Sequence, residues 1–140
     1  MKTIDEIINN APYERLNNAL IERSMELAKK IRQAMRSAEI NEVGDYSIRT
    51  VRTRSGFSDT ALYIEAESND YWRSEPEYHS LEQTTSGYYT GDFNSWIEAA
   101  NGKERLKILN DARDILDEIE SIKQKRMEDV KKALKSVENL

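Results

Sequence analysis

The chain has 140 residues, of which 38% are hydrophobic, and its formal net charge is −5. This length supports one hydrophobic core rather than two, so we predict a single domain over 1–140. The absence of cysteine excludes disulfides and thiolate metal sites, and no apolar run suits a signal peptide or a membrane span, so we expect a cytoplasmic protein without membrane contact.

Two helices separated by Pro12 are the first predicted elements. The sequence Thr3-Ile4-Asp5-Glu6 has the form of a capping box, which predicts a short helix over about 3–10. The residue before a proline disfavours the helical region, and a proline suits a first helical position, so a second helix is expected over about 12–38. Its apolar residues keep a helical stripe, at Leu16, Leu20, Leu27, Ile31, Ala34, Met35 and Ala38.

A β region is expected next, over about 45–90. Residues that favour strands dominate 45–54 and 60–67, and the turn sequence between these segments contains a glycine, so the two segments predict a hairpin. Pro76 excludes a central strand at 75–77. A further strand is predicted over 84–90.

A short helix is then predicted over about 95–101. The sequence Ser95-Trp96-Ile97-Glu98 again has the form of a capping box. Asn101-Gly102 is expected to end this helix, because glycine is the residue that most often follows a helix terminus.

A long amphipathic helix is predicted over 103–139. Its apolar residues follow a 4-3-4-3 spacing from Ile108 to Ile122. The spacing next reaches Arg126 and recovers at Val130, which indicates a local interruption of the seam.

These elements predict an α+β fold in which two long amphipathic helices pack antiparallel, with a small antiparallel β-meander of two to four strands inserted between them in sequence. The helices would be roughly 40 Å and roughly 55 Å long, so the end of the second one stays uncovered by the first. One interpretation is that Ile4, Ile7 and Ile8 of the N-terminal helix cover it. We favour a twofold homodimer instead, with an interface formed by Met127, Val130, Leu134 and Val137.

No motif in the sequence indicates catalysis. A glycine-rich phosphate loop, a nucleophile elbow and an HExxH motif are all absent. His79 is the only histidine, and with Glu75 and Glu77 nearby it is interpreted as a structural residue rather than a metal ligand or a base. We therefore expect no enzymatic activity, no cofactor and no metal.

The charge distribution indicates a contact surface. Residues 15–54 carry nine Lys/Arg and five Asp/Glu (+4), whereas 57–98 carry one Arg and nine Asp/Glu (−8). An acidic surface favours a basic protein surface as partner and opposes direct binding of nucleic acid, although acidic residues can also simply solvate loops. Aromatic residues with polar neighbours are typical of binding surfaces. The predicted partner-binding residues are Tyr71, Trp72, Glu75, Glu77, Tyr78, Glu82, Tyr88 and Tyr89.

A second interpretation is a protein that binds or sequesters a small ligand such as a nucleotide. Arg49, Arg52 and Arg54 belong to the first predicted strand, and arginine beside aromatic rings suits a nucleotide or phosphate. A third interpretation is a structural helical dimer without a ligand. The same arginines can instead pair with acidic residues across the hairpin, at Asp59, Glu65 or Glu67.

In its overall make-up, the chain resembles accessory proteins of phages and mobile elements that act by binding a host protein, including anti-CRISPR inhibitors. The resemblance is one of composition, because the chain is small, acidic, cysteine-free and without a catalytic signature. It implies a non-enzymatic inhibitor that presents the acidic, aromatic β region to a basic surface of its partner.

Overall fold

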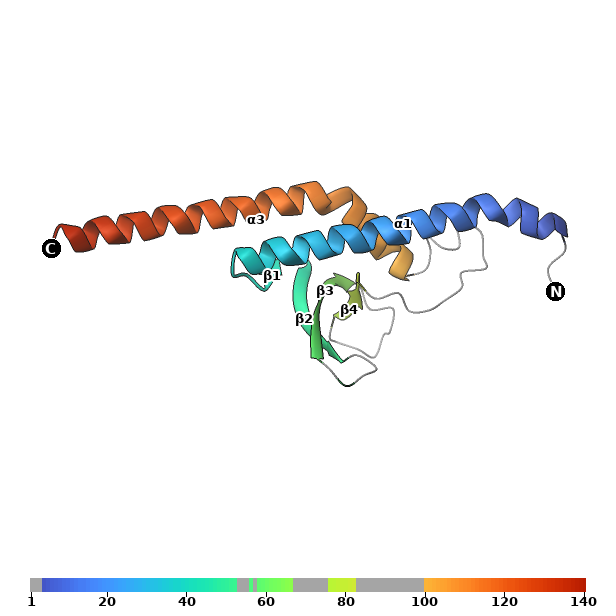
Figure 1. The fold of residues 1–140 in the computed structure, drawn as a ribbon, viewed down its shortest axis with the longest axis horizontal. Helices are drawn as coiled ribbons and strands as arrows, with labels where there is room; N and C mark the ends of the chain where they lie inside the picture. The colour runs from blue at the N-terminus through green and yellow to red at the C-terminus, as the bar shows by residue number, and fades with distance from the viewer. Residues whose placement is uncertain (1–3, 53–55, 57, 67–75, 83–99) are drawn as a thin grey trace.

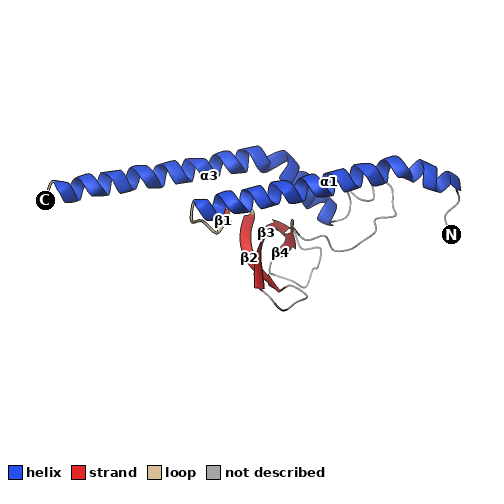
Figure 2. Ribbon diagram, viewed as in Figure 1, coloured by secondary structure: helices blue, strands red, loops and turns tan. Residues whose placement is uncertain are grey.

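A computed structural model describes residues 4–52, 56, 58–66, 76–82 and 100–140 (Figure 1). Within these residues, two helices and a four-stranded antiparallel sheet confirm the predicted α+β class (Figure 2). The predicted strand at 84–90 and the first part of the predicted helix at 95–101 lie outside the described residues. The elements are α1 (Ile4–Ser37), β1 (Glu42–Val43), β2 (Tyr46–Arg52), β3 (Ser58–Ala66), β4 (Glu77–Ser80) and α3 (Ala100–Glu138).

α1 is one continuous helix, so the predicted break before Pro12 is wrong. Pro12 has no N–H to donate to the carbonyl of Ile8, and an interior proline costs about 3 kcal/mol. A helix of 34 residues tolerates this local loss, because it buries its apolar side against the rest of the protein farther along.

α1 ends in a left-handed turn at Glu39, which has a φ of 57°. The N–H of Ile40 donates to the carbonyl of Met35 at 3.0 Å, and the N–H of Glu39 donates to that of Arg36 at 3.1 Å. This is the hydrogen-bond pattern of a Schellman motif. Since Ile40 and Met35 are both buried, packing holds the turn although Glu39 is not a glycine.

The sheet has the strand order β1-β2-β3-β4. β2 and β3 pair antiparallel with Tyr46 opposite Ile64 and Arg52 opposite Ser58, which confirms the predicted hairpin. β1 and β4 were not predicted, because β1 has two residues and β4 begins directly after Pro76. Among the described strands, β4 lies at the edge of the sheet, and this position agrees with the exclusion of a central strand there.

α3 begins before Gly102, so the predicted helix end at Asn101-Gly102 is wrong. A glycine inside a helix costs only about 1 kcal/mol relative to alanine. The strong amphipathic pattern that follows outweighs this cost, and α3 runs to Glu138.

The core lies between the helices and one face of the sheet. Because side chains alternate along a strand, Tyr46 and Ile48 of β2 share this face with Leu62 and Ile64 of β3. α1 and α3 contribute their apolar stripes to the same core. The buried helix residues include Leu27, Ala28, Ile31, Met35, Ile108, Ala112, Ile115 and Ile119.

α1 and α3 run in the same direction, so the predicted antiparallel pairing is wrong. Arg105 of α3 donates to Ser24 Oγ of α1 at 2.8 Å, and Lys123 donates to Ser37 Oγ at 3.4 Å, so position increases together along both helices. Figure 1 shows both helices advancing toward the same end of the molecule. Only a short loop would force antiparallel neighbours, and the connection here runs from 38 to 99 and includes the sheet.

Tyr46 links the sheet to α3. Its side chain is buried, and its hydroxyl donates to Asp111 Oδ2 at 3.4 Å. Burial, and then the neighbouring charge of Asp111, raise the pKa of this hydroxyl well above its ordinary value. The folded state therefore holds the tyrosine proton more tightly than the unfolded state does.

We expect this proton to make the protein sensitive to alkali. The contribution of Tyr46 to stability is complete below about pH 10 and declines above it, by up to about 1.4 kcal/mol per pH unit. Urea unfolding of the parent and of Tyr46→Phe between neutral and alkaline pH checks this, because the phenylalanine variant should lose that part of the decline. An identical alkaline decline in both proteins would contradict it.

Candidate interaction surface

The last third of α3 exposes an apolar stripe. Met127, Val130, Leu134 and Val137 are 53%, 58%, 57% and 65% exposed, whereas Ile119 on the same side of the helix is 2% exposed. Figure 1 shows α3 continuing well past the end of α1. The N-terminal end of α1 lies at the opposite end of the molecule, so it does not cover this stripe as one interpretation of the sequence required.

A groove of about 370 Å³ lies at the base of this stripe, where α1 ends against α3. Its lining combines apolar side chains with three cations and one acid. The lining residues are Ser37, Ala38, Glu39, Lys123, Arg126, Met127, Val130 and Lys131. The groove and the exposed stripe therefore form one continuous surface, which shares Met127 and Val130.

Arg126 fixes the wall of the groove. Its guanidinium donates to the carbonyl of Ala38 and, at 3.2 Å, to that of Glu39. The carbonyls at a helix C-terminus lack partners within the helix and carry partial negative charge, so a cation there is favourable. The polar residue that interrupts the apolar seam of α3 thus binds the end of α1.

The charge of α3 changes sign along its length. Residues 111–120 carry five acids and one base, whereas 123–138 carry six bases and three acids, a net charge of −4 followed by +3. The exposed stripe is therefore flanked by basic residues. This is the opposite of the acidic surface predicted for partner binding.

In the β region, Arg49 stacks on Tyr78. The guanidinium carbon lies 3.3 Å from the ring centroid, and Arg49 Nε also donates to Ser47 Oγ at 3.2 Å. The sequence suggested a ligand held between an arginine and aromatic rings, whereas here Arg49 and Tyr78 contact each other directly and join β2 to β4 within the chain. Such a contact contributes about 0.5–1 kcal/mol at an exposed site. Of the other two proposed ligand-binding arginines, Arg52 ends β2, and Arg54 lies outside the described residues.

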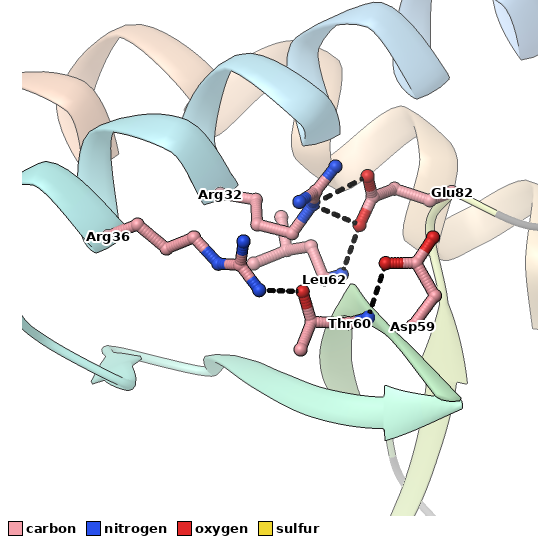
Figure 3. Close-up of polar contacts among 6 residues, drawn as sticks. All are labelled: Arg32, Arg36, Asp59, Thr60, Leu62 and Glu82. Atoms are coloured by element: carbon pink, nitrogen blue, oxygen red, sulfur yellow. Dashed lines mark hydrogen bonds and ion pairs between the residues drawn. The ribbon is translucent and has the colours of Figure 1, made fainter. Parts of the chain in front are cut away.

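Glu82, one of the predicted partner-binding residues, is used within the structure (Figure 3). Its carboxylate accepts from Arg32 Nε at 2.8 and 3.0 Å, and it also accepts the backbone N–H of Leu62. Beside it, Arg36 donates to Thr60 Oγ1. These contacts connect α1 to β3 and to the end of β4. Five other predicted partner-binding residues lie outside the described residues, namely Tyr71, Trp72, Glu75, Tyr88 and Tyr89.

His79 lies between two acids. Its Nδ1 is 2.9 Å from Glu104 Oε2, and its Nε2 is 3.5 Å from Glu77 Oε2. The closer pair, between His79 and Glu104, lacks the alignment of a directed hydrogen bond. Within the described part of the chain, no group of three or more His, Cys, Asp or Glu side chains is arranged to hold a metal ion.

Sequence reasoning found the exposed stripe but missed the groove. The groove is lined by the cations Lys123, Arg126 and Lys131. The signal available in the sequence was Arg126, at a position where the spacing predicts an apolar residue.

No described helix is long and apolar enough to cross a membrane.

Comparisons with protein-family models, with curated proteins and with solved structures find no match to this chain. The surface is therefore interpreted from its own geometry and charge.

Proposed function

We propose that the chain is a non-enzymatic protein-interaction module, and that its binding surface is the exposed stripe of α3 together with the groove at its base. The observation that carries the proposal is the exposure of Met127, Val130, Leu134 and Val137 on the side of α3 that packs into the core nearer its start. Apolar residues at 3-4-3 spacing are the pattern by which a helix contacts another helix.

The acidic β region is not the surface that we propose. Two of its described members are engaged within the chain, Glu82 with Arg32 and Tyr78 with Arg49. On this proposal, the inhibitory role expected from composition is exercised by α3, through binding rather than catalysis.

A photoreactive residue tests the proposal. We expect p-benzoylphenylalanine at Leu134 to form covalent adducts with protein, because this position lies within the exposed stripe. The same residue at Lys132 is the control, since Lys132 is also exposed but points to the opposite side of the helix. The experiment uses the full chain, both purified and in extract of the cells that express it, with adducts resolved by mass.

Adducts that form from Leu134 and are lost in a Val130→Glu background support the proposed surface. Equal adducts from Leu134 and Lys132, or none from either, would overturn it.

A further inference from the structure

We propose that the occupant of this surface is the same segment of a second copy of the chain, lying antiparallel, so that two molecules associate tail to tail through α3. This inference rests on the proposed function and names its partner. Four observations carry it: the symmetry of the stripe, the place where α1 ends, the charges of the groove and the charges beside the stripe.

The stripe reads the same from either end. Its spacing of three, four and three residues means that an antiparallel copy can place Met127 opposite Val137 and Val130 opposite Leu134. Each of the four residues of the stripe then meets another one. A twofold contact requires this self-complementarity, because both molecules use the same residues.

The structure leaves room for a helix of this length. α1 reaches only as far as Lys123 and Arg126 on α3, and α3 then continues to Glu138. The uncovered stretch from Met127 to Glu138 is about 18 Å long at 1.5 Å per residue. In the register given above, the second copy covers this stretch and ends where α1 ends.

The groove suits the end of the incoming helix. The last carbonyls of the second α3 lack partners within their helix and carry partial negative charge. The register brings them toward Lys123 and Arg126, which line the groove. These cations already contact the C-terminal end of α1, so they would serve two helix ends of the same kind.

Charges beside the stripe favour the antiparallel direction. Lys131 and Glu138 are seven residues apart and flank the stripe on the same side, so antiparallel copies present Lys131 of each molecule toward Glu138 of the other. The two Lys131 side chains also approach each other near the twofold axis. The two Glu138 carboxylates offset the repulsion between these lysines. A parallel pair would instead bring Arg126 beside Lys131, two like charges.

The expected association is moderate. It buries four half-exposed side chains from each molecule, less than the roughly 800 Å² per partner that typical stable complexes bury. Dissociation constants in the micromolar range follow, because the cost of association offsets much of the gain from burial. Both species should therefore be visible across an accessible concentration range.

Cysteine cross-linking tests the register, since the chain contains no cysteine of its own. We expect mild oxidation of an equimolar mixture of Met127→Cys and Val137→Cys to give a covalent mixed dimer. Each variant alone should give little, because the antiparallel register separates like positions by about 15 Å along the axis. Cross-linking of Met127→Cys with itself would overturn the antiparallel arrangement.

A charge exchange tests the contact without cysteine. Glu138→Lys and Lys131→Glu should each weaken association severalfold in sedimentation equilibrium, and the double variant should restore it. The matched control is Lys132→Glu, which makes the same charge change on the far side of α3 and should have a smaller effect. Charge changes that all weaken association equally, with no restoration, would overturn the proposed pair.

The two proposals can fail separately. A monomeric parent chain at about 100 µM, ten or more times the expected dissociation constant, overturns the second copy as occupant. If Leu134 then still forms specific adducts with other proteins, the interaction module stands with a different partner. If Leu134 forms no adducts either, both proposals fail.

Discussion

Ile115→Asp is expected to unfold the protein, whereas Val130→Asp should leave its stability almost unchanged. Both positions lie on the apolar side of α3, but Ile115 is 9% exposed within the core and Val130 is 58% exposed beyond it. A carboxylate at Ile115 would be buried without a partner, a loss of about 4 kcal/mol or more that a small domain cannot sustain. At the exposed position the expected change is within about 0.5 kcal/mol.

Circular dichroism and urea unfolding at low protein concentration check this pair of substitutions. Low concentration matters because it keeps the proposed association from contributing. Leu27→Asp on α1 should behave like Ile115→Asp, since Leu27 lies in the same core. Ile115→Val is the conservative control and should cost only about 1 kcal/mol. Cooperative melting of Ile115→Asp near the parental temperature would show that the two helices do not share this core.

The elements that the sequence predicted well are those encoded by local periodicity. Strand-favouring residues on either side of a turn sequence defined the hairpin of β2 and β3, and the three-and-four spacing of the apolar residues from Ile108 to Ile122 defined the buried side of α3. Such patterns specify which side of an element is buried, because neighbouring residues carry the information. They do not specify the direction of the element against which that side packs. A parallel and an antiparallel partner bury the same stripe, so the relative direction of α1 and α3 could not be read from it.

Local breaking signals were given too much weight at both helix starts. Pro12 and Gly102 each make the helix locally less stable. Burial of the apolar stripe that follows each of them stabilises the continued helix by more than this loss. Where a helix has a long buried side, a single breaker is weak evidence for its end.

The candidate surface was only partly predictable for a related reason. The exposed end of α3 was predicted from a difference in helix length. In the structure α1 and α3 have 34 and 39 residues, and the end of α3 is exposed because α1 is displaced along it and stops beside Lys123 and Arg126. The groove depends on where Ala38 and Glu39 meet Arg126, a contact between residues more than eighty positions apart. Charge counting likewise assigned Glu82 to an acidic surface and could not identify Arg32, fifty positions away, as its partner.

The contact with Arg32 makes Glu82 important for stability. Replacing Glu82 should lower the free energy of unfolding, and this is the second-largest effect that we expect. The side chains of Arg32 and Glu82 are 15% and 13% exposed, so neither charge is well solvated when the other is removed. We expect Glu82→Leu to cost about 2–3 kcal/mol, because it strands the guanidinium and leaves the N–H of Leu62 without its carboxylate acceptor. The expected value lies below that of a fully buried pair, since both side chains retain some contact with water.

A double-mutant cycle separates this pair from its surroundings. Arg32→Leu alone should cost about 2 kcal/mol, and the double variant should lose about 1–2 kcal/mol less than the sum of the single losses, because it leaves no charge behind. The exposed pair Arg23 and Glu26, at 57% and 70% exposure, is the matched control, and Glu26→Leu should change stability by less than about 1 kcal/mol. Additive losses in the cycle would mean that Arg32 and Glu82 stabilise the protein independently. The coupling that we expect would instead show that the end of β4 is held to α1 by one shared contact.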